Sequence, residues 1–276
     1  MAAKSLFFKT TTVPNAEIEY EVIPNCLPQT TMFVHGNLAS HRWWYPTEEV
    51  AKRNYKGQTL TGDMILVNFR GCGKSSAPKN LSEVNMRLFA EDFNQLALSL
   101  QKKSEKINLV GHSTGGLIVG LMLAQKPDLY NKAVMLDPVG ATGVKFDDSM
   151  TAAFEQMKVD KNLTGIVLAS TIYNCNTESD FFKQVVVEDA FSAINSVGAW
   201  VLQSLDGFDG KSDLMTVQHP VLVLHGEHDS LLPVVESKAM AVLMKNGRFE
   251  IVPGQGHCTN VENPEKLVNL MDGFLF

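Results

Sequence analysis

Short apolar runs that end at glycine or polar residues recur along the chain, and they predict the strands of a sheet. The runs cover residues 31–34, 64–69, 107–110, 133–136, 221–224 and 249–252. Runs of this length, rich in Val, Ile, Leu, Met and Phe, are typical of strands buried on both faces. Two further β-prone runs, residues 6–12 and 18–23, flank Pro14 and Asn15 and predict an opening hairpin.

Between several of these runs the apolar residues follow a helical spacing. Residues 82–100 place Met86, Phe89 and Phe93 on one face, and residues 264–274 predict a helix that closes the chain. Strands that alternate with helices imply a parallel sheet, in which ligands bind beyond the carboxyl ends of the strands.

The alternation lapses between residues 143 and 213, where mostly helical patterns carry scattered aromatic residues. We therefore expect an α/β fold with a mostly parallel central sheet flanked by helices, and a helical cap inserted at residues 143–213. Residues 1–142 and 214–276 would form the two parts of the sheet domain. A chain of 276 residues is long enough for one such domain with an insertion.

The composition narrows the classes of partner. Lysine and arginine total 24 against 30 aspartate and glutamate residues, and the net charge of −6 gives no electrostatic reason to expect nucleic-acid or anionic-membrane binding. No apolar stretch approaches the roughly 18 residues of a membrane span, and residues 1–12 lack the continuous apolar region of a signal peptide. We expect a small-molecule substrate and a cytoplasmic location.

The cysteines support the same location. Cys26, Cys72, Cys175 and Cys258 lie far apart in the sequence and form no Cys-x-x-Cys pair. This spacing indicates neither a zinc site nor a disulfide framework, as is usual in a reducing compartment. Cys258 follows His257 but lacks the sequence context of a nucleophile, and we expect it to be buried.

One segment carries a pattern for nucleophilic chemistry, namely Gly111-His112-Ser113-Thr114-Gly115, which follows a predicted strand and precedes an apolar helical run. In this context Gly-x-Ser-x-Gly is typical of a nucleophile elbow, a tight turn that exposes the serine hydroxyl. The positive end of the following helix would face negative charge that develops near Ser113. The pattern is short, so a chance match, or a serine that only caps the helix, stays open.

Two other glycine patterns fail at defined positions. The segment from Gly71 to Ser75 ends like a phosphate-binding loop, but that motif requires glycine where this chain has Asn68. A dinucleotide-binding motif would require glycine in place of Ser113. Neither pattern supports a nucleotide cofactor.

A base and an acid for Ser113 occur at two other strand ends. A serine hydroxyl is a poor nucleophile unless a base takes its proton and an acid orients that base. Asp229 and His257 each follow a predicted strand, at the sheet edge where Ser113 is expected. The order Ser113, Asp229, His257 is one of the chain orders in which this triad occurs.

With these residues the chain resembles the α/β-hydrolase fold family over residues 30–140 and 215–276. The resemblance rests on motifs at the predicted strand ends: His35-Gly36, Arg70-Gly71-x-Gly73-x-Ser75, Gly111-His112-Ser113-Thr114-Gly115-Gly116, Gly226-Glu227-His228-Asp229 and Gly256-His257. It implies that the backbone N–H groups of Asn37 and Thr114 form an oxyanion hole, with Leu38 as a substitute for Asn37. It also implies a reaction with no cofactor and no metal.

Two residues depart from particular relatives in this family. Related epoxide hydrolases and haloalkane dehalogenases carry aspartate as the nucleophile, so Ser113 argues against both chemistries. Many relatives have aspartate where this chain has Asn68, a difference that bears more on loop packing than on the triad.

The identity of the acid stays open between two aspartates. Asp137 ends the strand before the cap, a position that serves as the acid in some members of the family. Asp229 fits the common pattern better, since it closes a Gly-x-x-Asp segment and precedes Leu231-Leu232-Pro233.

The remaining histidines have other interpretations. We expect His35 to be structural and His112 to serve packing beside the nucleophile. His225 and His228, with Asp229, could suggest a metal, but they end a strand and lack the helical His-Glu-x-x-His spacing.

These residues together predict a serine hydrolase of small, largely apolar carboxylic esters. Ser113 would attack the carbonyl, His257 would transfer the proton, Asp229 would orient the imidazole, and water would release the acyl-enzyme. The same triad could cleave a lactone, a thioester, an amide or a carbon-carbon bond, and a ligand receptor on a hydrolase scaffold is a further alternative. Activity should rise with pH as His257 loses its proton.

Overall fold

A single sheet organises the chain in the computed structural model, which describes residues 4–24, 29–53, 62–102 and 105–276. In the described residues the strand order is β1-β2-β4-β3-β5-β6-β7-β8. The strands are β1 (Leu6–Lys9), β2 (Glu17–Ile23), β3 (Thr31–Val34), β4 (Met64–Val67), β5 (Ile107–His112), β6 (Tyr130–Leu136), β7 (Pro220–Gly226) and β8 (Asn246–Val252). All pairs from β4 to β8 are parallel, and β2 pairs with β1 and β4 in antiparallel fashion. The predicted fold class is confirmed.

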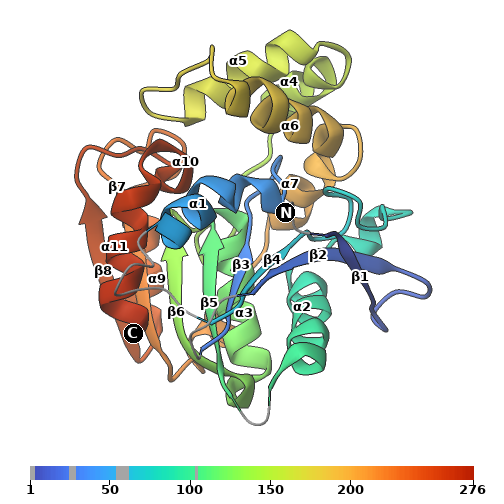
Figure 1. Cartoon of the computed structure of the whole chain (residues 1–276). Coiled ribbons are helices and arrows are strands. Elements are labelled where there is room, and N and C mark those ends of the chain that lie inside the picture. The colour runs from blue at the N-terminus through green and yellow to red at the C-terminus, as the bar shows by residue number, and fades with distance from the viewer. Residues whose placement is uncertain (1–3, 25–28, 54–61, 103–104) are drawn as a thin grey trace.

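Helices cover both faces of this sheet because successive strand residues point to opposite faces. Met32 belongs to the buried cluster that includes Phe93, whereas the next residue, Phe33, belongs to the cluster that includes Met271. The flanking helices are α1 (Tyr45–Arg53), α2 (Met86–Leu100), α3 (Thr114–Gln125), α9 (Val234–Leu243) and α11 (Pro264–Leu275). Helices α1 and α11 lie on one face, and α2, α3 and α9 lie on the other (Figure 1).

Residues 143–213, called the helical segment below, lie between β6 and β7 and contain no strand among the described residues. Their helices are α4 (Asp148–Val159), α5 (Lys161–Thr171), the π-helical turn η4 (Phe182–Val186), α6 (Val187–Ile194), α7 (Gly198–Leu205) and α8 (Lys211–Leu214). Asp147 and Asp160 cap α4 and α5, since their carboxylates accept from the Met150 and Leu163 N–H groups. Figure 1 shows α4, α5 and α6 beyond the carboxyl ends of the strands.

No single described helix is both long and apolar enough to cross a membrane. Residues 182–194 and 198–205 would reach that length and composition only as a pair, and they meet at a bend of 67°. The described cysteines Cys72, Cys175 and Cys258 are free thiols. Cys26 lies outside the described residues.

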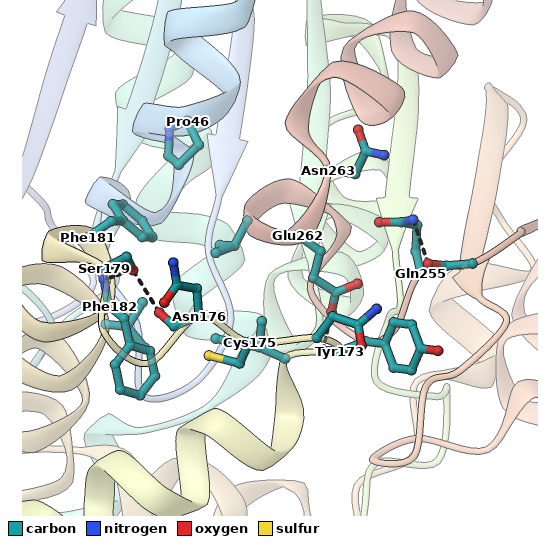
Figure 2. A pocket seen from close by; sticks show the side chains of 15 residues that line it. Pro46, Tyr173, Cys175, Asn176, Ser179, Phe181, Phe182, Gln255, Glu262 and Asn263 are labelled. Carbon is teal, nitrogen blue, oxygen red and sulfur yellow. Dashed lines mark hydrogen bonds between the residues drawn. The ribbon is translucent and has the colours of Figure 1, made fainter.

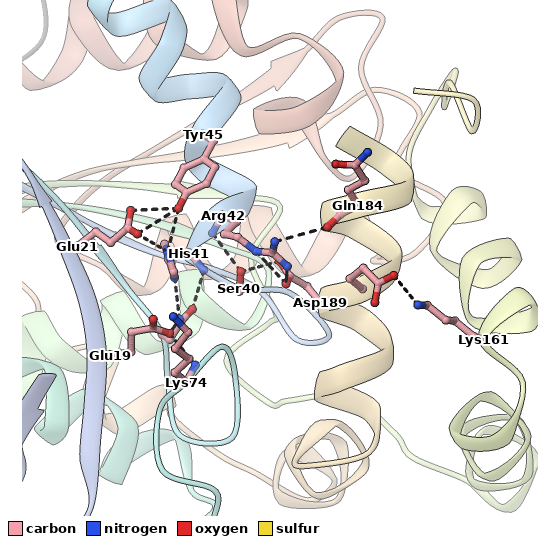
Figure 3. Close-up of polar contacts among 12 residues, drawn as sticks. Glu19, Glu21, Ser40, His41, Arg42, Tyr45, Lys74, Lys161, Gln184 and Asp189 are labelled. Carbon is pink, nitrogen blue, oxygen red and sulfur yellow. Dashed lines mark hydrogen bonds and ion pairs between the residues drawn. The ribbon is translucent and has the colours of Figure 1, made fainter. Parts of the chain in front are cut away.

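A polar contact joins the sheet domain to the helical segment (Figure 3). Asp189 of α6 accepts hydrogen bonds from Ser40 Oγ at 2.6 Å and from Arg42 Nε at 3.1 Å. Ser40 caps the short helix η1 (His41–Trp44), which follows the loop after β3. Burial raises the pKa of Asp189, against the opposing effects of Arg42 and Ser40. The contact therefore fixes α6 against the chain that leaves β3.

Asn68 lies in a second polar group on the other side of η1. Its side-chain amide donates to Glu19 at 2.8 Å, and its carbonyl oxygen accepts from the His41 N–H at 2.6 Å. A Cβ at Gly73 would lie 2.0 Å from the Asn68 amide, so the 70–75 loop packs directly on this side chain. The geometry agrees with a role for Asn68 in loop packing.

Several element boundaries differ from the expected ones. Strand β4 ends at Val67, because the Asn68 N–H bonds to the Glu19 carbonyl and the chain then turns. Helix α2 begins at Met86, where the Asn85 side chain accepts from the Arg87 N–H, and a short 3-10 turn (Leu81–Glu83) precedes it. Helices α1 and α9 have no counterpart among the predicted elements. The remaining short helices are η3 (Pro127–Leu129) and α10 (Thr259–Glu262).

Candidate active site

Ser113 occupies a strained turn between β5 and α3. Its φ of 54° and ψ of −119° are values that L-residues rarely adopt. Its side chain makes no capping hydrogen bond to α3, which argues against a serine that only caps the helix. Thr114 is the first residue of α3, so its N–H has no partner within the helix and is available beside the Ser113 hydroxyl.

The glycines of the turn are required by close backbone packing. A Cβ at Gly111 would lie 2.3 Å from the Gly115 carbonyl oxygen, and a Cβ at Gly115 would lie 2.3 Å from the Val34 carbonyl oxygen. Both distances are far below van der Waals contact, and the obstructing atoms belong to the backbone. The pattern Gly-x-Ser-x-Gly thus allows α3 to pack against β3 and β5 while it presents Ser113.

His257 and Asp229 come together at the ends of β8 and β7. The His257 Nδ1–H donates to Asp229 Oδ2 at 2.8 Å, which leaves Nε2 as the basic nitrogen of the ring. Asp229 also accepts from the N–H groups of Leu231 and Leu232, at 2.7 and 3.1 Å. Burial acts to raise the pKa of Asp229, but the hydrogen bond and charge of His257 together with these amides lower it. Asp229 is therefore ionised beside His257.

Asp137, the alternative acid, has different partners. Its Oδ1 accepts from the Gly226 N–H at 2.7 Å and lies 3.6 Å from Nδ1 of His225. The hydrogen bond from His257 goes to Asp229, so the geometry favours Asp229 as the residue that orients the base.

The loop after β3 lies against the nucleophile. A Cβ at Gly36 would lie 3.0 Å from Ser113 Cβ. Asn37 and Leu38 follow, and Leu38 has a positive φ of 55°. The Asn37 side chain donates to the Gly198 carbonyl of α7 at 3.0 Å, which ties this loop to the helical segment. The expected oxyanion residues Asn37 and Thr114 line the same cavity as Ser113, and so does Leu38.

These residues open into one cavity of about 540 Å³ between the sheet domain and the helical segment. Ser113, His257, Asn37 and Thr114 line it, and most of the other lining side chains are apolar. Those from the sheet domain include Leu38, Trp43, Val139, Leu231 and Leu232, and those from the helical segment include Met150, Phe154, Val167, Leu168 and Leu202. A cavity of this size and lining is suited to a small apolar molecule.

Residues 32–264 match the family model described as the alpha/beta hydrolase fold. The chain belongs to the alpha/beta hydrolase fold family. The match covers most of the chain, including the Ser113 turn, the helical segment and the strand ends that carry Asp229 and His257.

Similar proteins within this family carry varied names. Protein ABHD8 of Bos taurus is 25% identical over an alignment of 250 residues that covers 88% of this chain and 55% of that protein, so this chain spans about half the length of that relative. A putative non-heme chloroperoxidase of Synechocystis is 28% identical over 227 residues, covering 77% of this chain and 80% of that protein. The solved structure of a thermophilic esterase from Thermogutta terrifontis superposes with a TM-score of 0.80 at 21% identity, covering 99% of this chain and 98% of the other. At this identity the structural match shows a shared hydrolase fold.

One residue of this alpha/beta hydrolase site had no signal in the sequence. Glu262 of α10 accepts from the N–H groups on both sides of His257, Gly256 at 2.6 Å and Cys258 at 3.0 Å. The same carboxylate accepts from the Tyr173 N–H of the helical segment at 2.9 Å, so it fixes the His257 loop against that segment. Figure 2 shows Glu262 and Tyr173 in the wall of a separate cavity behind this loop. The spacing from Cys258 to Glu262 is one residue longer than in a capping box, so no sequence pattern marked Glu262.

The structure places none of His35, His112, His225 and His228 as a base for Ser113 or as a metal ligand. The His112 ring donates to the His257 carbonyl at 2.9 Å, and burial lowers the pKa of His112 to about 3, so it is neutral and positions the His257 backbone. Burial also lowers the pKa of His35 to about 3. His225 bonds to the Ser237 hydroxyl, whereas His228 stacks on Tyr173 at the surface. Because His225 and His228 contact different residues, their positions give no support to a metal site formed by this pair.

Proposed function

We propose that this chain is a serine hydrolase that cleaves carboxylic esters with small, largely apolar acyl or alcohol parts through an acyl-enzyme intermediate. One observation carries the proposal: Ser113, on its strained turn, and His257, paired with Asp229, line the same apolar cavity. The family assignment supports hydrolysis as the class of reaction. It does not identify the bond that is cleaved, which is inferred from the residues of the site.

In the proposed reaction His257 acts first as base and then as acid. Asp229 accepts the hydrogen bond from the His257 Nδ1–H. The unprotonated Nε2 of His257 therefore accepts the proton of the Ser113 hydroxyl as the serine oxygen attacks the ester carbonyl. The carbonyl oxygen becomes negative in the transition state, where the backbone N–H groups of Thr114 and of Asn37 or Leu38 would stabilise it. The tetrahedral intermediate then collapses, and the leaving alcohol takes the proton from His257.

Water completes the cycle by the same steps. His257 takes a proton from water, the hydroxide oxygen bonds to the acyl carbon, and Ser113 leaves with the proton returned by His257. The products are one acid and one alcohol, and the site returns to its starting state. Every group in this sequence belongs to the chain or to the two substrates, ester and water.

The substrate preference follows from the cavity lining. Most side chains that line the cavity are apolar, and Lys145 and Glu236 are its two lysine and glutamate residues. Lys145 is paired with Asp206 at 3.2 Å. Burial of an uncharged acyl chain against this lining is favourable by about 0.8 kcal/mol per methylene. Esters with charged acyl groups should therefore be poor substrates.

Hydrolysis of p-nitrophenyl butyrate by three proteins tests the proposal. Ser113→Ala should lose at least about a thousandfold in kcat, since triad members act as a unit. Ser82→Ala, which removes an exposed serine hydroxyl outside the cavity, should match the wild type. Equal turnover by wild type and Ser113→Ala would refute the proposed nucleophile, and a strong preference for lactones over linear esters would replace the proposed substrate class.

A further inference from the structure

Asp137 is a buried carboxyl group that the proposed reaction does not use. It follows β6, its φ is +43°, and its side chain is fully inaccessible. One carboxyl oxygen, Oδ1, accepts from the Gly226 N–H at 2.7 Å. The other, Oδ2, is buried and meets no N–H or O–H donor among the described residues. A negative charge on this buried carboxyl group, with one oxygen unmatched, would be costly.

The groups that face Asp137 come from three neighbouring elements. Ligand atoms of Asp137, Asp229 and His257 all lie within 4.8 Å of one another. His225 of β7 lies 3.6 Å from Asp137 Oδ1, and Glu262 of α10 adds a further negative charge nearby. Two aspartates this close in a buried site cannot both be ionised at low cost, so one of them holds a proton.

The distribution of hydrogen-bond donors decides which aspartate is protonated. Asp229 accepts from His257 Nδ1 and from the N–H groups of Leu231 and Leu232, whereas Gly226 is the one donor to Asp137 among the described residues. Burial, followed by the charge of Asp229, raises the pKa of Asp137 well above its ordinary value. A proton on the unmatched Oδ2 would make this oxygen a donor, with the Asp229 carboxylate as an acceptor nearby.

We propose that Asp137 is a neutral positioning residue whose carboxyl O–H donates a hydrogen bond to the Asp229 carboxylate and holds it toward His257. This inference rests on the proposed function, because it assigns a role beside the proposed base. It also excludes Asp137 as the acid of the triad. Asp137 touches neither substrate nor the reacting serine and acts only through Asp229.

Two substitutions separate this role from the alternatives. The amide introduced by Asp137→Asn is neutral and keeps a donor for Asp229 and an acceptor for Gly226, so kcat should stay within about threefold of wild type and the acidic limb of the kcat/KM profile should not move. Asp137→Leu removes the donor, and kcat should fall about tenfold or more with KM nearly unchanged, because a lost hydrogen bond to a charged group is worth at least a factor of about ten.

The pH profile of kcat/KM would reveal an ionised Asp137. If Asp137 were ionised, Asp137→Asn would remove a negative charge beside the imidazole, and the acidic limb would move down by about one pH unit. That displacement would overturn the proposal. So would unchanged kcat in folded Asp137→Leu, which would reduce Asp137 to a structural residue, or activity that a chelator removes and a divalent metal restores.

Unfolding equilibria measured without substrate keep this inference separate from the proposed function. A folded chain that keeps the Asp137 proton, when the unfolded chain releases it above about pH 4, becomes less stable as pH rises. Relative to Asp137→Asn, the unfolding constant of the wild type should therefore increase from about pH 5 to 8, by up to about tenfold per pH unit. A constant ratio would overturn the protonated Asp137 even if Ser113→Ala had confirmed the hydrolase.

Discussion

At the scale of single residues, the proposed nucleophile and one residue of the loop after β3 adopt backbone conformations that favour glycine, although neither residue is glycine. Ser113 and Leu38 have φ values of 54° and 55°. Such conformations cost about 1–3 kcal/mol each and persist where the surrounding packing imposes them. Here that packing comes from Gly36, Gly111 and Gly115, whose missing side chains allow three backbone segments to meet at the turn.

Gly115→Ala should destabilise the fold by about 3 kcal/mol or more, since its Cβ would lie 2.3 Å from the Val34 carbonyl oxygen and 2.5 Å from that of His35. Gly273→Ala is the matched control: it also lies in a helix, but its Cβ would meet nothing within 4 Å. That variant should gain up to about 1 kcal/mol from helix propensity. Urea unfolding compares the two, and equal stability would show that the turn is not closely packed.

The residues of the site were largely predictable, whereas their environment was not. Ser113, Asp229 and His257 each follow a strand signal, and parallel strands bring their carboxyl ends to one edge, so the sequence alone predicts their proximity. The choice between Asp137 and Asp229 required the hydrogen bond from His257, because both aspartates end neighbouring strands. The catalytic roles themselves remain predictions that the experiments above test.

At the scale of secondary-structure elements, the contact of α6 with η1 connects the helical segment to the proposed oxyanion loop. Asp189 accepts from Ser40 and Arg42, residues that follow Asn37 and Leu38 closely in the chain. The adjacent residue on α6, Glu188, instead forms an exposed pair with Lys161 of α5. Substitutions at Asp189 and Glu188 therefore compare a buried ion pair with an exposed one on the same helix.

Asp189→Asn should lower the free energy of unfolding by about 1–3 kcal/mol, because it leaves buried donors with a weaker acceptor. It should also reduce kcat more than KM if the oxyanion loop depends on this contact. Glu188→Gln should change stability by less than about 0.5 kcal/mol. Chemical denaturation and steady-state kinetics on both variants check this, and similar effects of the two would argue against the coupling.

Element prediction succeeded where the hydrophobic period was decisive and failed where tertiary contacts set the limits. The 31–34 run matches β3 residue for residue, because this central strand is buried along its whole length. Helix α1 was missed, since its polar sequence, Tyr45–Arg53, gains its stability by packing on α11. The start of β8 at Asn246 was missed as well, because this edge strand is mostly exposed and lacks an apolar run.

At the scale of the whole molecule, the cavity exists only because the helical segment covers the carboxyl edge of the sheet. Its lining comes from both parts, so the shape of the cavity depends on contacts such as those of Glu262 with Tyr173 and of Asn37 with Gly198. These pairs are separated by 89 and 161 positions in the sequence, and no local pattern could have indicated them.

Val167→Phe should shift the proposed esterase toward shorter acyl chains, since the larger ring would occupy part of the 540 Å³ cavity. Each methylene that no longer fits should cost about tenfold or more in kcat/KM. Ile166→Phe, one position earlier on α5 but exposed, is the control and should leave the chain-length profile unchanged. A series of p-nitrophenyl esters from acetate to octanoate provides the measurement, and parallel profiles for the two variants would place the acyl chain elsewhere.

The central claim is that Ser113 is a nucleophile activated by His257, and covalent labelling tests it most directly. Wild-type protein treated with a fluorophosphonate should gain one adduct per chain by intact mass, located on Ser113 by peptide mapping. His257→Gln should be labelled at least about a hundredfold more slowly, because general-base assistance is lost, and Ser113→Ala should not be labelled. An adduct on another residue, or equal labelling rates for wild type and His257→Gln, would contradict the account.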